Sequence, residues 1–302
     1  MLDGALQLYR QERYLEAIDY INRHAHEVQG NMAQIYNFLY SLESKAGKIN
    51  LALATFQEAV EEKGIWYSAN YLRSDPDLDP LRTFEMFDRL VEICREREEA
   101  AKKNSRPQLK VVSPPHPAGG VVISLHGNQD NIDITEPYWR EVVELGWTLA
   151  LPQSSTIDLS DAYVWRDHEK GIKELGEHYR NLMREHPVPP EKVVLGGFSA
   201  GCQVALGAVL SGEARAKALL LMGPYLPNIE EWSVRLEALR AQGTKVHIVI
   251  GERDEDCLPG ARRLAALLEE KGLPYSMRLI PGLVHDYADD FGADIRAAIE
   301  DP

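Results

Sequence analysis

One short segment of the sequence has the residue types that serine-based acyl transfer needs. Gly197-Phe198-Ser199-Ala200-Gly201 joins the apolar run KVVLGG to the apolar run AGCQVALGAVL. A serine between a buried strand and a buried helix lies on a sharp, strained turn, which needs very small residues two positions away on either side. Free N–H groups at the start of the helix also favour negative charge that develops on a substrate. We therefore expect Ser199 to be a nucleophile.

A nucleophilic serine needs a base, and the base needs a carboxylate that orients it. The strand KVHIVIG (245–251) leads into a loop with Asp254 and Asp256, and the strand SMRLI (276–280) leads into a turn with His285. The order serine, acid, histidine is typical of such sites, and strand ends at one edge of a parallel sheet converge in space. We expect His285 to be the base and Asp254 to be the acid, with Asp256 as the alternative acid.

Two backbone N–H groups would stabilise the tetrahedral oxyanion that acyl transfer forms. One is the N–H of Ala200, directly after the nucleophile. The second is expected from the turn after the strand GVVISLH, where Gly127 lets the chain bend and the N–H of Asn128 can face the serine. We expect His126, which ends this strand, to be structural, because His285 is better placed as the base.

Candidate substrate contacts lie in loops above the same sheet edge. They are Gln129, in the turn with Asn128, and Tyr163 and Trp165, in the loop after the strand TLALP. The two aromatic residues fit equally well as anchors of the helix that follows this loop.

The elements that position these residues follow from the hydrophobic pattern of residues 106–302. Short apolar runs alternate there with helical patterns, which predicts an α/β domain with a doubly wound, mostly parallel sheet. The predicted strands are 109–112, 120–126, 148–152, 192–197, 217–223, 245–251 and 276–280, and the predicted helices lie near 135–145, 165–185, 200–211, 228–241, 260–271 and 284–299. The turn SPPHPAGG is expected to join the first two strands as an antiparallel pair.

Residues 1–105 contain only helical patterns. The segment RYLEAIDYI aligns with KINLALATF at a shift of 35 residues, when Ala17 is placed on Ala52. A shift near this length is typical of stacked helix–turn–helix units. Gly47, Ala52, Phe56 and Ala59 resemble the small and aromatic positions of a tetratricopeptide repeat (TPR). We predict a smaller all-α, TPR-like domain that precedes the α/β domain, with an ordinary helical bundle as the alternative.

Composition narrows the classes of protein and of partner. The chain has 302 residues and a formal net charge of -14, which disfavours nucleic acid and anionic membranes as partners. The cysteines Cys94, Cys202 and Cys257 show neither a disulfide framework nor zinc-ligand spacing. The N-terminus lacks the apolar core of a signal peptide, and no apolar run is long enough to span a membrane. We expect a cytoplasmic protein without a bound metal.

The segments ISLHGN, GGFSAGC, VIGERDEDCLP and PGLVHDY, in this order, resemble the α/β-hydrolase superfamily, and within it the phospholipase/carboxylesterase branch, which includes acyl-protein thioesterases. The resemblance covers about residues 109–300. It implies cleavage of carboxylic esters or thioesters through an acyl-enzyme, without a metal or an organic cofactor. The chain departs at Ala200, where this branch usually has Gln, and at Asn128 and Gln129, where the hormone-sensitive lipase group has glycines. The helical N-terminal region is a further departure.

Two other functions stay open. A serine peptidase of the same fold is one, although such enzymes usually restrict access with a β-propeller or insertions. A non-catalytic protein that binds a partner through the helical repeats is the other, although decayed hydrolases typically lose a residue that this chain keeps. The helices would bind a protein partner, associate with a second copy or cap the active site. The sequence favours a hydrolase of small-molecule esters or thioesters.

Overall fold

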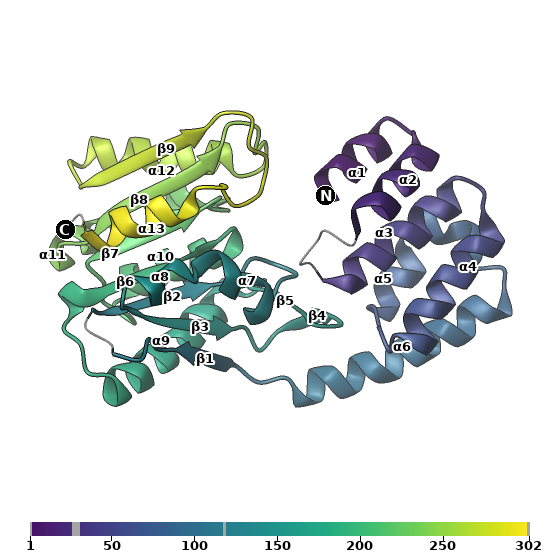
Figure 1. The fold of residues 1–302 in the computed structure, drawn as a ribbon, viewed down its shortest axis with the longest axis horizontal. Helices are drawn as coiled ribbons and strands as arrows, with labels where there is room; N and C mark the ends of the chain where they lie inside the picture. Colours follow the sequence, from purple (N-terminus) through teal and green to yellow (C-terminus); the bar gives the residue numbers. More distant parts are fainter. Residues whose placement is uncertain (1, 26–30, 117–118, 301–302) are drawn as a thin grey trace. The chain divides into compact units, whose positions relative to one another are not determined.

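The computed structural model of the chain describes residues 2–25, 31–116 and 119–300. These residues form two compact units (Figure 1). One unit contains the residues up to Ser105 together with Thr156–Tyr163, and the other contains Arg106–Ser155 and the residues from Val164 onward. We call them the helical unit and the α/β unit.

The helical unit is a series of short antiparallel helices followed by one long helix (Figure 1). Its elements are α1 (Leu2–Arg10), α2 (Tyr14–His24), α3 (Met32–Lys45), α4 (Ile49–Gln57), the π-helical turn η2 (Glu58–Glu62), α5 (Ala69–Ser74), the 3-10 helix η3 (Pro76–Leu81), α6 (Glu85–Asn104) and the strands β4 (Ile157–Leu159) and β5 (Ala162–Tyr163). Aromatic rings fill its core, where Phe56 lies 4.9 Å from Tyr40 and 5.7 Å from Phe87 between ring centroids. The TPR-like character of these helices stays a prediction.

The hairpin of β4 and β5 differs from our expectation that all of residues 106–302 form one domain. Its two strands pair antiparallel, and Ile157 and Leu159 pack against the apolar core of the helical unit. Ser160 at its tip accepts a hydrogen bond from the backbone N–H of Trp66 (2.7 Å) and, through its carbonyl, from Asn31 Nδ2 (2.9 Å). These contacts place Thr156–Tyr163 in the helical unit.

The α/β unit contains a seven-stranded sheet in the order β1-β3-β2-β6-β7-β8-β9. Its strands are β1 (Gln108–Val112), β2 (Val121–Leu125), β3 (Thr148–Gln153), β6 (Val193–Phe198), β7 (Ala218–Met222), β8 (Lys245–Gly251) and β9 (Tyr275–Ile280). Its helices are α7 (Ile132–Trp139), α8 (Glu141–Glu144), α9 (His168–Glu185), η4 (Pro190–Lys192), α10 (Ala200–Ser211), η5 (Ile229–Leu236), α11 (Glu237–Gln242), α12 (Leu258–Glu270) and α13 (Phe291–Glu300). All neighbouring strands are parallel except β1 and β3, which confirms the predicted fold class.

Apolar residues cover both faces of this sheet, because successive side chains of a strand point to opposite faces. In β6, Val193 and Leu195 pack into one core with α9, α10 and α12, while Val194 packs into the other with α7, α8 and α13. Both layers of helices are visible around the sheet in Figure 1. Two covered faces explain why the strands are continuous apolar runs in the sequence.

The predicted pairing of the first two strands is wrong. The edge strand β1 pairs antiparallel with β3, with Gln108 opposite Gln153, and β3 lies between β1 and β2. Every residue of β3 is buried, whereas β1 is partly exposed throughout. A strand buried on both faces needs a neighbour on each side, while a half-exposed strand fits the edge. Of the turn SPPHPAGG, residues 117 and 118 lie outside the described residues.

The last helix starts later than predicted. We expected a helix over 284–299, but α13 begins at Phe291, and the residues before it form a turn. This turn bonds to the loop after β8, because the N–H of Arg253 donates to the carbonyl of Leu283 (2.9 Å). The N–H of Glu252 in the same loop donates to the carbonyl of Ile280, the last residue of β9 (2.9 Å). None of the described helices has the length and apolarity that a membrane span requires.

Candidate active site

Ser199 lies on a strained turn between β6 and α10. Its backbone adopts φ 53° and ψ −121°, a left-handed conformation that a residue with a side chain rarely takes. The flanking glycines are sterically required. A Cβ on Gly197 would lie 2.8 Å from the carbonyl oxygen of Leu125, and one on Gly201 would lie 2.5 Å from that of His126. The fold therefore forces the hydroxyl of Ser199 out of the sheet at the start of a helix.

The side chains of Ser199, His285 and Asp254 form one hydrogen-bonded chain. His285 Nε2 lies 2.9 Å from Ser199 Oγ, and His285 Nδ1 lies 2.6 Å from Asp254 Oδ2. Asp254 is buried, and its second oxygen accepts a hydrogen bond from the backbone N–H of Cys257 (3.1 Å). The alternative acid, Asp256, is exposed and lines the neighbouring pocket. The structure thus brings together the three residues that we predicted from three separate strand ends.

Close packing of two loops explains how His285 reaches Asp254. A Cβ on Gly251, the last residue of β8, would lie 2.3 Å from the carbonyl oxygen of Leu283. The turn before α13 therefore lies directly against the end of β8. On its other side the imidazole of His285 stacks on Phe198, with the ring centroids 4.7 Å apart. The imidazole of His285 is held by a strand end, a loop and an aromatic ring.

The turn after β2 lies over Ser199. A Cβ on Gly127 would approach Phe198 Cδ1 to 2.9 Å and the Cβ of Ser199 to 3.5 Å. Asn128 lines the pocket, and its side-chain oxygen accepts a hydrogen bond from the backbone N–H of Trp165 (2.8 Å). Ala200 is buried at the first position of α10. The two predicted oxyanion donors therefore belong to segments that border Ser199.

Two ionisable groups, the buried His126 and the half-buried Asp130, support this turn. Burial lowers the pKa of His126 to about 4. Its Nδ1 donates to the carbonyl of Gly127 (2.6 Å) and its Nε2 accepts from the N–H of Ser154 (3.2 Å), which fixes one neutral tautomer. Burial also raises the pKa of Asp130 to about 6, although the carboxyl accepts hydrogen bonds from the N–H groups of Gly127 and Asn131. The neutral, hydrogen-bonded state of His126 fits the predicted structural role.

The predicted substrate residues lie elsewhere. Trp165 is buried, donates from Nε1 to the carbonyl of His126 (2.8 Å) and stacks on its ring, so it anchors the chain to the turn after β2. Tyr163 belongs to β5, in the hairpin of the helical unit. Gln129 is exposed and has a positive φ of 60°. A substrate role for Gln129 and Tyr163 stays a prediction.

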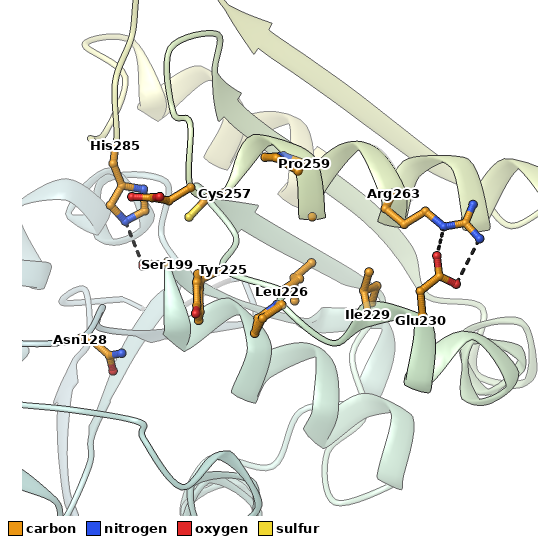
Figure 2. A pocket seen from close by; sticks show the side chains of 13 residues that line it. Asn128, Ser199, Tyr225, Leu226, Ile229, Glu230, Cys257, Pro259, Arg263 and His285 are labelled. Carbon is orange, nitrogen blue, oxygen red and sulfur yellow. Dashed lines mark hydrogen bonds and ion pairs between the residues drawn. The ribbon is translucent and has the colours of Figure 1, made fainter.

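A pocket of about 820 Å³ opens beside Ser199 within the α/β unit (Figure 2). Its walls come from two segments that the sequence did not single out as substrate contacts. One follows β7, and the other is the start of α12. The lining residues are Asn128, Ser199, Tyr225, Leu226, Pro227, Ile229, Glu230, Asp256, Cys257, Pro259, Gly260, Arg263 and His285. The one sequence signal for the first wall is the position of YLP (225–227), two residues beyond the buried strand β7.

Among the described residues, one group has metal-ligating atoms close together, namely Asp254, Cys257 and His285, whose ligand atoms lie within 4.8 Å of one another. Two of them already bond to each other. Burial, and then the charge of Asp254, raise the pKa of the Cys257 thiol, so this residue stays protonated at neutral pH. Because the thiolate is the form that ligates metals, this group suits proton transfer better than metal binding.

Both parts of the chain have known relatives. A family model described as "A/B hydrolase-like, N-terminal domain" matches residues 1–102. An uncharacterized protein from Bacillus cereus of known crystal structure shares 42% sequence identity, and the match covers 99% of this chain and 97% of that chain with a TM-score of 0.59. The helical region and the α/β region therefore occur together in that relative as well.

Other relatives match only part of the chain. Acyl-protein thioesterase 1 of Gibberella zeae is 25% identical over 161 residues, which make up 51% of this chain and 63% of that protein. A carboxylesterase from Bacillus cereus shares 18% identity over 66% of this chain and 95% of its own, with a TM-score of 0.50. At so low an identity the second likeness shows a shared fold alone.

Proposed function

We propose that the chain, which belongs to the α/β-hydrolase superfamily, is a serine hydrolase of the phospholipase/carboxylesterase-like branch that cleaves carboxylic esters or thioesters through an acyl-enzyme. The observation that carries this proposal is the continuous chain of hydrogen bonds from Asp254 through His285 to Ser199. An unactivated serine is a weak nucleophile, and this arrangement supplies the base and its orienting carboxylate.

In the proposed reaction Ser199 Oγ bonds to the substrate carbonyl carbon while its proton passes to His285 Nε2. Asp254 holds the imidazole in the tautomer with hydrogen on Nδ1 and stabilises the imidazolium that forms. The N–H groups of Asn128 and Ala200 donate to the carbonyl oxygen as it gains negative charge. Collapse of the tetrahedral intermediate expels the alcohol or thiol, which takes the proton from His285.

Deacylation uses the same residues. His285, neutral again, removes a proton from a water molecule that attacks the acyl carbonyl, and the carboxylic acid leaves Ser199 as its hydroxyl is restored. Esters and thioesters share the attacked carbonyl and the oxyanion, so one set of residues serves both. The same acyl-transfer chemistry therefore applies whether the leaving-group atom is oxygen or sulfur.

Steady-state hydrolysis of p-nitrophenyl butyrate and of a butyryl thioester by the wild type and by Ser199→Ala tests the proposal. We expect the variant to lose turnover by about 10⁴-fold or more, because removal of the nucleophile leaves only binding and oxyanion stabilisation. The ratio of the two wild-type kcat/KM values gives the preference between ester and thioester. Equal turnover in the two proteins would exclude Ser199 as the nucleophile.

A further inference from the structure

The pocket beside Ser199 is an elongated groove with the reactive residues at one end. Figure 2 shows Ser199 and His285 at this end and Glu230 and Arg263 at the other, with Leu226 and Ile229 along the wall between them. Leu226 and Ile229 are themselves buried residues. The groove therefore leads from the reactive hydroxyl along an apolar wall to a pair of charges.

The opposite wall is one face of helix α12. Pro259, Gly260 and Arg263 line the groove, and their spacing of three and four residues places them on neighbouring turns of one helix face. A Cβ on Gly260 would lie 3.1 Å from the carbonyl oxygen of Leu226 and 3.4 Å from its Cβ. The two walls thus come close together where neither has a charged side chain.

The far end of the groove is bridged by an ion pair. Arg263 on α12 donates through Nη2 and Nε to both carboxylate oxygens of Glu230 on η5, and the Nη2 contact measures 3.1 Å. Arg263 Nη1 also donates to Glu270 (3.1 Å). A bidentate guanidinium–carboxylate pair has a fixed geometry. Both side chains keep part of their surface in water, with 39% of Arg263 and 62% of Glu230 exposed.

Resting on the proposed function, we propose that this groove binds a linear aliphatic chain of the ester or thioester, and that the Arg263–Glu230 pair limits the length of that chain. A chain that reaches the pair must remove water from two charges, which is unfavourable. Arg263 follows Cys257, the residue that caps α12 beside His285, by six positions, a rise of about 9 Å at 1.5 Å per residue. At about 1.2 Å per bond in an extended chain, the groove holds roughly seven bonds.

The test compares the wild type with Glu230→Ala/Arg263→Ala on two series of esters. One varies the acyl chain of p-nitrophenyl esters from acetyl to hexadecanoyl, and the other varies the alcohol chain of alkyl butyrates, so the two series show which side of the scissile bond occupies the groove. In one series the wild-type kcat/KM should rise by roughly fourfold per methylene and fall once the chain exceeds about eight carbons. In the double variant the ratio of kcat/KM for the 12-carbon chain to that for the 4-carbon chain should rise about tenfold or more.

Two matched variants separate the effect of the pair from that of general damage. Arg180 and Glu213 form a similar ion pair (2.6 Å) away from the groove, and Arg180→Ala/Glu213→Ala should keep the wild-type chain-length profile. Glu230→Gln/Arg263→Met removes the charges at nearly constant volume and should also shift the profile to longer chains. This variant keeps the test valid if the double alanine variant fails to fold.

The outcomes distinguish this inference from the function on which it rests. If the wild type hydrolyses esters and Ser199 reacts with a fluorophosphonate, but neither variant of the Arg263–Glu230 pair changes the chain-length profile, the inference is wrong and the proposed function stands. If no ester of either series is hydrolysed and Ser199 does not react, both are wrong. A shift of equal size in the Arg180–Glu213 variant would also overturn the inference.

Discussion

At the scale of single residues, Asp254 and Asp256 differ sharply although they lie in one loop. Asp254 is buried and bonds to His285, whereas Asp256 is exposed. We expect Asp254→Asn to lower kcat by about 10⁴-fold, because the amide favours the wrong imidazole tautomer. Asp256→Asn, the matched control, should change kcat by less than about threefold. Steady-state kinetics on p-nitrophenyl butyrate checks both values, and the reverse order would assign the acid to Asp256.

The free energy of unfolding should depend on pH through the carboxyl of Asp130. Burial raises the pKa of this carboxyl to about 6 in the folded state, above its ordinary value of 3.8. As the pH falls, the folded protein therefore takes up this proton before the unfolded chain does. The free-energy cost of burying the charged carboxylate is fully present well above pH 6 and disappears as the group is protonated. Relative to Asp130→Asn, the wild type should gain about 1.4 kcal/mol in its free energy of unfolding between pH 7 and pH 5.

Urea unfolding of both proteins at several pH values measures this difference. A variant that gains or loses stability by the same amount as the wild type across the range would show that Asp130 does not titrate near pH 6. The carboxyl accepts hydrogen bonds from the N–H groups of Gly127 and Asn131. The stability of the Asp130→Asn variant therefore also measures how strongly the turn before α7 depends on this side chain.

The hydrogen-bonded chain of Ser199, His285 and Asp254 was predictable from the sequence, and the residues that line the pocket beside it were not. Ser199, Asp254 and His285 each follow a buried strand, and a parallel sheet brings such positions together whatever its loops do. The groove depends instead on where η5 meets α12, so that Leu226 faces Gly260. No local pattern encodes that meeting. Of the two aromatic residues that fitted a substrate wall and a helix anchor equally well, Trp165 is an anchor for the turn after β2.

At the scale of elements, helix α10 contains two glycines with different surroundings. A Cβ on Gly201 would meet the backbone oxygens of His126 (2.5 Å) and Leu125 (2.8 Å), while one on Gly207 would first meet the flexible end of Ile172 (2.4 Å). Alanine gains about 1 kcal/mol of helix propensity over glycine at an interior position. A clash with fixed backbone costs about 1–3 kcal/mol or more, and a side chain can move aside.

We therefore expect Gly201→Ala to lower the free energy of unfolding by about 2 kcal/mol and to slow the reaction of Ser199 with fluorophosphonates. Gly207→Ala should change stability by less than about 1 kcal/mol and leave that reaction unaffected. Urea unfolding and the labelling rate measure the two effects. Equal effects of both substitutions would show that the elbow between β6 and α10 does not require a glycine at position 201.

Edge strands and strand-end turns were the elements that the sequence predicted least well. β1 pairs with β3, and this pairing gives β3 a neighbouring strand on each side. Which strand lies at the edge is a property of the whole sheet. The start of α13 depends on backbone bonds between the turn after β9 and the loop after β8, such as that from Arg253 to Leu283. In both cases a long-range contact decides the local structure, and helical or strand periodicity contains no information on it.

At the scale of the whole molecule, the hairpin of β4 and β5 shows that the helical unit is not continuous in sequence. Ser160 bonds to Trp66, which lies 94 residues earlier in the chain. Ser160→Ala should remove the hydrogen bond to the N–H of Trp66 and destabilise this contact by about 1–2 kcal/mol. Hydrogen–deuterium exchange of the full chain should then become faster in residues 156–163 and near Trp66, while the amides of β6 and α10 keep their protection.

Faster exchange confined to β6 and α10, with residues 156–163 unchanged, would contradict this assignment of the hairpin to the helical unit. Ser113→Ala offers a matched control, because Ser113 bonds to Thr148 within the α/β unit (3.3 Å) and should leave the exchange of the hairpin unaffected.

Covalent labelling is the decisive test of whether Ser199 is a nucleophile that His285 activates. The full chain is treated with a fluorophosphonate, and the modified peptide is located by mass spectrometry in the wild type, in Ser199→Ala and in His285→Ala. We expect one label on Ser199 in the wild type, none in Ser199→Ala and a labelling rate reduced by several orders of magnitude in His285→Ala. A label on another residue, or equal labelling of Ser199 with and without His285, would contradict this expectation.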